Sequence, residues 1–123
     1  MEEKFIAKID FYTLLCKLIL ITGFSFSFFL LLFWLLAAHS IGHFPTYGNP
    51  DPKELSIYCI FGPLIILLMN FWFFSIIPSL FLPIWLYFKT KKETYLIYFI
   101  LGLFIHFITF LITATEIFEW FLD

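Results

Sequence analysis

Residues 55–88 read LSIYCIFGPLIILLMNFWFFSIIPSLFLPIWLYF, 34 consecutive residues without an Asp, Glu, Lys or Arg. Two other stretches share this property: residues 18–50, with 33 residues, and residues 94–115, with 22. A charge at the bilayer centre costs about 3 kcal/mol on insertion scales, and a helix needs about 20 apolar residues to cross the hydrocarbon. The spacing of charges therefore predicts an all-α, polytopic membrane protein with three transmembrane helices.

The composition points to the same class. Hydrophobic residues make up 63% of the 123 residues, 20 residues are Phe, and the mean hydropathy is +1.01. A soluble domain is only about half apolar, so the lipid bilayer is the first expected partner. The net charge of −2 and the presence of Lys as the only strong base argue against nucleic-acid binding. No motif predicts a cofactor.

We expect a single domain with spans at residues 18–38, 52–88 and 95–115, an outer loop at 39–51 and an inner loop at 89–94. The first span is longer than the apolar core of a signal peptide, so we expect it to be retained. Six of the seven lysines then lie on one side of the membrane: Lys4, Lys8, Lys17, Lys89, Lys91 and Lys92. The positive-inside rule makes that side the cytoplasm. This predicts a multi-pass protein of a bacterial cytoplasmic (inner) membrane, with its N-terminus inside and its C-terminus outside.

Aromatic residues near the ends of the spans agree with this placement, because Trp and Tyr favour the level of the lipid headgroups. The inner interface is expected at Tyr12, Trp85, Tyr87 and Tyr95, and the outer one at Trp34, Tyr47, Tyr58 and Trp120.

The second span is unusual in its length and its prolines. As a straight helix, residues 55–88 would be about 50 Å long, against a hydrocarbon core of about 30 Å. Each of Pro63, Pro78 and Pro83 removes a backbone donor, so we expect kinks near them. The alternative is a partly re-entrant stretch around residues 77–83, covered by protein.

The clearest local signal precedes this span, in the sequence Asn49-Pro50-Asp51-Pro52-Lys53-Glu54. Asp51 as N-cap, Pro52 at the first helical position and Glu54 two residues later predict a capping-box start for the second helix. The functional alternative is that Asp51 and Glu54 bind a cation.

Polar or small residues recur along the third span at intervals of 4, 3, 4 and 3 residues. They are Gly102, His106, Thr109, Thr113 and Glu116. This spacing predicts one helix face that meets the first span, the second span or a partner, because polar groups are costly against lipid. The functional alternative is a proton or ion path from the midplane to the outer surface.

Two further pairs of residues indicate contacts between helices. Gly23 and Ser27 form a small-xxx-small pair in the first span, which favours close contact with another helix. Asn70 and His106 lie near the middle of their spans, so we expect both at the midplane, where they could hydrogen-bond to each other. The functional alternative for this second pair is a quinone or proton site.

A weaker pattern concerns metal binding at the outer end. His39 and His43 are four residues apart, which places both imidazoles on one face if the first span stays helical there. Glu116 and Glu119 are expected on the same side of the membrane, so the four residues could form a divalent-metal site. The alternative is that they serve interfacial and capping roles.

No motif of high catalytic specificity is present, and three helices offer little surface for mutual burial. We therefore expect a non-enzymatic accessory or assembly subunit of a larger membrane complex, with other subunits or copies of itself as partners. The first alternative is a self-assembling proton or ion conductor, or a membrane-active effector, that uses Asn70, His106 and Glu116. The second alternative is a protein that functions through the outer metal site.

Overall fold

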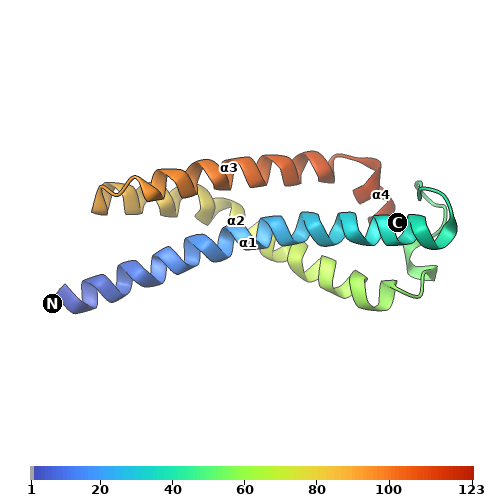
Figure 1. Cartoon of the computed structure of the whole chain (residues 1–123), viewed down its shortest axis with the longest axis horizontal. Helices are drawn as coiled ribbons and strands as arrows, with labels where there is room; N and C mark the ends of the chain where they lie inside the picture. The colour runs from blue at the N-terminus through green and yellow to red at the C-terminus, as the bar shows by residue number, and fades with distance from the viewer. Residues whose placement is uncertain (1) are drawn as a thin grey trace.

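The computed structural model describes residues 2–123, and over this range the regular structure is entirely helical (Figure 1). The long helices are α1 (Glu2–Ile41), α2 (Tyr58–Thr90) and α3 (Thr94–Thr113). The 3-10 helix η1 (Pro52–Glu54) and the short helix α4 (Glu116–Leu122) complete the chain. Three helices, over Ile6–Ile41, Tyr58–Thr90 and Thr94–Thr113, are long and apolar enough to cross a membrane. The predicted all-α protein with three spans is confirmed.

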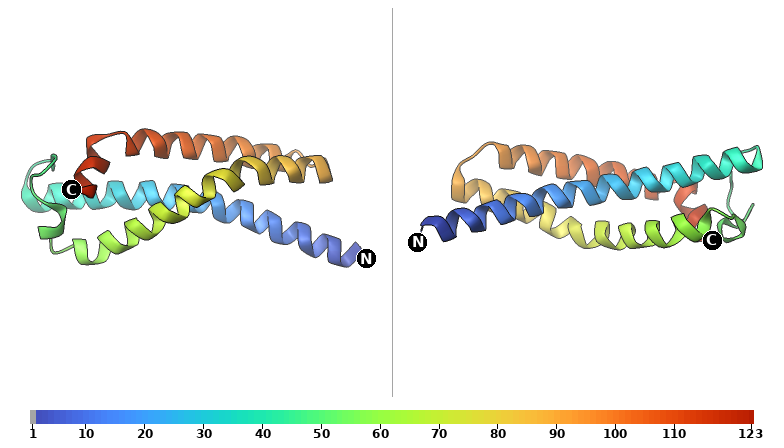
Figure 2. Two further views of the ribbon diagram at one scale, coloured as in Figure 1. Left: turned by 180° about the vertical axis from the view of Figure 1, so that it is seen from behind. Right: turned by 60° about the horizontal axis from the view of Figure 1, so that its bottom comes forward.

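The three long helices lie side by side along the long axis of the molecule (Figures 1 and 2). The start of α1 and the connection between α2 and α3 lie at one end, and residues 42–57 together with α4 lie at the other. The α2–α3 connection is short because Lys91 takes the left-handed conformation, with φ of 57°, and its N–H donates to the Tyr87 carbonyl. This is a common way to end a helix and reverse the chain.

Helix α2 is continuous through all three of its prolines, so the re-entrant alternative is not observed. It changes direction near its middle, in the yellow part of Figure 2. Pro78 lies in this region and offers no N–H to the carbonyl of Phe74, which explains a bend there. On either side of Pro78, the Ser75 and Ser79 hydroxyls donate to helix carbonyls at 2.7 Å.

The predicted start of the second helix at residue 52 is wrong. Asp51 is an N-cap residue whose carboxylate accepts a 2.8 Å hydrogen bond from the Lys53 N–H, but the helix that it caps is η1. Leu55 then adopts an extended conformation, with φ of −77° and ψ of 130°, which separates η1 from α2. Among the described hydrogen bonds, none from the Glu54 side chain completes a capping box. Helix α2 therefore begins at Tyr58.

The third span also ends earlier than predicted. Helix α3 stops at Thr113 because Thr115 is extended, with φ of −98° and ψ of 163°, and the chain turns there into α4. Glu116 therefore belongs to a different helix from the rest of the predicted polar face. Trp120, expected near the outer interface, lies on α4, which folds back over the bundle and leaves this side chain 0% exposed.

The core is formed by aromatic and aliphatic side chains at the end of the bundle that holds α4. One stripe of α1, spaced at intervals of 4, 3 and 4, supplies Phe26, Leu30, Phe33 and Ala37. The Phe33 ring is central, since it stacks on Trp120 with centroids 5.3 Å apart and on Phe61 with centroids 5.6 Å apart. A smaller cluster of Cys16, Leu86 and Tyr95 joins the helices at the other end.

Candidate functional site

The predicted polar face of α3 meets the predicted small-residue pair of α1. The hydroxyls of Ser27 and Thr109 lie 2.8 Å apart, and Thr109 Oγ1 lies 3.3 Å from the Gly23 carbonyl oxygen. A consistent assignment has Ser27 donating to Thr109, and Thr109 donating to the carbonyl. Both side chains are buried, so these hydrogen bonds satisfy polar groups inside the bundle.

Two glycines allow the helices to approach each other. A Cβ atom at Gly23 would lie 2.8 Å from the Ile105 side chain of α3 and 3.5 Å from Trp72 of α2. A Cβ atom at Gly102 would lie 3.7 Å from Leu20 of α1 and from Ser79 of α2. Each glycine is therefore a point where all three long helices come together.

His106 lies on the same face of α3, half-buried, but takes no part in these hydrogen bonds. Its Nδ1 atom is buried without a hydrogen-bond partner among the described residues, and so is the Nε1 atom of Trp72. The two rings are 6.4 Å apart between centroids. Trp72 is therefore the neighbour that α2 presents to His106, a contact that sequence reasoning missed.

Asn70, by contrast, lies on an exposed face of α2, and none of the described hydrogen bonds joins it to His106. Its Nδ2 donates to the Ile66 carbonyl at 2.8 Å within the same helix. Residues two apart on a helix point in very different directions, so an inward Trp72 directs Asn70 outward. The expected pairing of Asn70 with His106 is not observed.

The rest of the predicted polar face does not continue as one line. Thr113 is half-buried and its hydroxyl donates to the Phe110 carbonyl of its own helix at 2.8 Å. Glu116 is exposed at the start of α4. The five residues therefore divide into packing contacts at Gly102 and Thr109, an unpaired His106, and two residues near the end of the bundle.

The four residues of the predicted metal site are all exposed, and the structure does not gather them. His39 lies in the last turn of α1, while His43 follows Gly42, where φ is 81°, with its Nδ1 atom 3.1 Å from the Phe44 carbonyl oxygen. Glu116 and Glu119 lie on α4. Within residues 2–123, no group of three or more His, Cys, Asp or Glu is placed to bind a metal ion.

The two cysteines differ in their surroundings. Cys16 is buried in α1 with 2% of its surface exposed, within the cluster that joins α1 to α2. Cys59 is exposed in the first turn of α2, and its thiol lies 3.1 Å from the Ser56 carbonyl oxygen. Both thiols are free.

Asn70 belongs to a continuous exposed face of α2. Its neighbours at helical spacing are all large and apolar, with between 41% and 74% of their surface exposed: Ile66, Leu67, Phe73, Phe74, Ile77 and Phe81. Such side chains suit lipid or a partner helix. An amide among them suits lipid poorly, because its polar atoms find no partner in hydrocarbon.

Together, the three spans and the contacts between them define a small multi-pass helical membrane protein. Compared with known protein families, curated proteins and solved structures, this chain matches none. Its function is therefore inferred from its own residues.

Proposed function

We propose that this protein is a non-enzymatic accessory or assembly subunit of a larger complex in a bacterial cytoplasmic membrane. In this proposal it contacts its partner through the exposed α2 face that contains Asn70. The observation that supports the proposal is the position of Asn70, which lies well inside the second span and points away from the bundle.

The hydrogen-bonding capacity of Asn70 explains why its position matters. The amide has two N–H donors and one acceptor oxygen, and one donor is used by the Ile66 carbonyl. The remaining donor and the oxygen are directed to the surroundings of the helix. A polar side chain on a partner helix at the same depth would bond them, and such contacts contribute about 0.6 to 2 kcal/mol in membranes.

The contacts of α3 support packing over transport as the role of its polar face. Gly102 and Thr109 already contact α1 and α2, so they are occupied within the chain. One observation favours the second candidate, a proton or ion conductor built from copies of the chain: the Nδ1 atom of His106 is buried without a partner among the described residues. Glu116 and Asn70, the other expected members of such a path, lie elsewhere.

The test is to purify the protein from its host in mild detergent, through a tag on the N-terminus, and to measure its assemblies by native mass spectrometry. We expect larger membrane proteins at fixed stoichiometry. Asn70→Leu should reduce their recovery several-fold, because it replaces the amide with an apolar side chain of similar size. Phe107→Leu, on the exposed face of α3, is the matched control and should recover the partners normally.

Two results would contradict the proposal. Recovery of only a homo-oligomer would contradict the accessory role and favour the proton or ion conductor. A flux assay on the His106→Leu variant would then test the conductor. Full recovery of the partners by the Asn70→Leu variant would place the contact on another face.

A further inference from the structure

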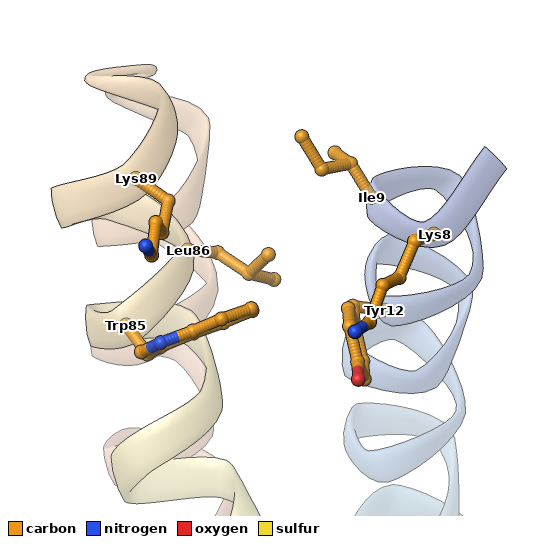
Figure 3. Close-up of a pocket in the computed structure, with 6 residues that line it drawn as sticks. All are labelled: Lys8, Ile9, Tyr12, Trp85, Leu86 and Lys89. Atoms are coloured by element: carbon orange, nitrogen blue, oxygen red, sulfur yellow. The ribbon is translucent and has the colours of Figure 1, made fainter. Parts of the chain in front are cut away.

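A cavity of about 180 Å³ opens between the start of α1 and the end of α2 (Figure 3). Helix α1 contributes Lys8, Ile9 and Tyr12 to its lining, and α2 contributes Trp85, Leu86 and Lys89. None of the described residues that line it is acidic. Two lysines, one from each helix, therefore line a cavity to which no described carboxylate contributes.

The two aromatic rings form the deeper end of this cavity. Tyr12 and Trp85 contact each other edge to face, with centroids 5.4 Å apart and ring planes at 82°. Figure 3 shows Trp85 and Tyr12 on facing helices, further from the end of α2 than Lys89. Trp and Tyr favour the level of the lipid headgroups, and lysine stems extend from there towards water. These preferences favour a position for the cavity near the level of the lipid headgroups.

Two apolar hollows lie along α2 on the side of the cavity nearer the middle of that helix. The first, of about 460 Å³, includes Trp85, Leu82, Phe81 and Pro78 in its lining. The second, of about 440 Å³, lies between α1 and α2 and includes Pro78, Phe74, Ile19 and Leu15. Trp85 is thus shared by the cavity and the first hollow, and Pro78 by the two hollows.

We infer that this cavity and the hollows below it bind one anionic phospholipid from the adjoining leaflet. The phosphate lies between Lys8 and Lys89, the glycerol region passes over Trp85, and an acyl chain occupies the apolar hollows. The length agrees: from Lys8 to Thr22, which lines the second hollow, α1 rises about 21 Å, more than the roughly 15 Å depth of one leaflet.

Charge decides which class of phospholipid fits. A zwitterionic headgroup brings its own cation to a cavity that two lysines already line. A headgroup with net negative charge neutralises them, and a lysine near the membrane surface favours anionic lipid by roughly a factor of five. The two lysines come from different helices, so binding also holds α1 and α2 together at this end.

The experiment uses the full chain in mild detergent micelles doped with phosphatidylglycerol or with phosphatidylcholine of the same acyl chains. The melting temperature is measured against lipid content. We expect phosphatidylglycerol to raise it more than phosphatidylcholine does. The double variant Lys8→Gln/Lys89→Gln should weaken the apparent affinity about 25-fold, whereas the control Lys17→Gln/Lys92→Gln, with the same loss of charge outside the cavity, should keep it.

Three results would overturn this inference. Equal shifts with the two lipids would mean that the hollows hold ordinary surrounding lipid. The same shift with inorganic phosphate alone would mean that the cavity takes a soluble anion. Unchanged affinity in Lys8→Gln/Lys89→Gln would place the lipid elsewhere. Native mass spectrometry of the unaltered protein adds a measurement that needs no variant: one retained phosphatidylglycerol per chain is expected, and none would contradict the assignment.

Discussion

The indole Nε1 of Trp120 donates a 2.7 Å hydrogen bond to the carbonyl oxygen of Pro50, and this bond ties α4 to the connection between α1 and α2. Trp120 is fully buried and stacks on Phe33 of α1. Close by, Lys53 Nζ donates to the main-chain oxygen of Asp123 at 2.7 Å. Segments 70 residues apart in the sequence therefore close the same end of the bundle.

The Trp120 bond can be tested with Trp120→Phe. We expect the free energy of unfolding to fall by about 1 to 3 kcal/mol, because the Pro50 carbonyl loses its donor and the smaller ring fills less of the core. Unfolding in detergent micelles, followed by near-UV circular dichroism, measures the change. Trp34→Phe is the control, since Trp34 is only half-buried and its indole makes none of the described hydrogen bonds. Equal losses in the two variants would argue against a special role for Trp120.

The two glycines at the helix crossings should respond differently to alanine. In Gly23→Ala the new methyl group meets the Ile105 side chain at 2.8 Å, so either this side chain or the helices must shift, and we expect a loss of about 1 to 3 kcal/mol. In Gly102→Ala the nearest atoms lie at 3.7 Å, an ordinary contact, so stability should hold within about 0.5 kcal/mol. Thermal melts of both variants in one detergent measure this difference in stability. A Gly102→Ala protein as unstable as Gly23→Ala would show that the α1–α3 spacing is not set at Gly23.

The hydroxyl pair between α1 and α3 calls for a double-mutant cycle. Ser27→Ala, Thr109→Val and the combined variant each abolish the hydrogen bond between the two hydroxyls, so the effects of the single variants should not add. We expect a coupling energy of about 0.6 kcal/mol, and at most about 2 kcal/mol, as for other hydrogen bonds between membrane helices. Strictly additive losses would mean that the two hydroxyls do not stabilise each other.

Substitution of His106, unlike substitution of Thr109, is not expected to destabilise the protein. Since its buried Nδ1 atom has no described partner, His106→Leu removes an unsatisfied polar group and fills the space with an apolar side chain. The melting temperature should stay the same or rise. A fall comparable to that of Thr109→Val would indicate that the imidazole makes a stabilising contact through water or a bound group.

Much of this fold could be predicted from the sequence, because membrane spans depend on where charges are absent. Each of the three charge-free stretches lies largely within one long helix, although α1 begins at Glu2, well before the predicted start of its span at residue 18. The prolines of α2 explain its bend. The starts and ends of helices were harder to predict. Leu55 and Thr115 adopt extended conformations that depend on packing at the end of the bundle, and neither residue type is a strong helix breaker.

The candidate site was predictable in part, for a similar reason. The spacing of Gly23, Ser27, Gly102 and Thr109 predicted faces that would meet other helices, and the structure brings these faces together. The direction of Asn70 could not be derived from its depth. Its orientation depends on which side of α2 packs inward, and that side is set by Trp72 and by Ile65, both buried against α1 and its neighbours.

The contrast between the two cysteines provides a built-in reporter of orientation. Cys59 is the exposed thiol and lies at the end of the bundle opposite the start of α1, whereas Cys16 is shielded. If the N-terminus is cytoplasmic, a membrane-impermeant maleimide added to intact cells should modify the unaltered protein at Cys59, and Cys59→Ser should abolish the reaction. Modification only after the cells are lysed would indicate the reverse orientation. The chain can therefore be oriented in its membrane with a single reagent and without a fused reporter.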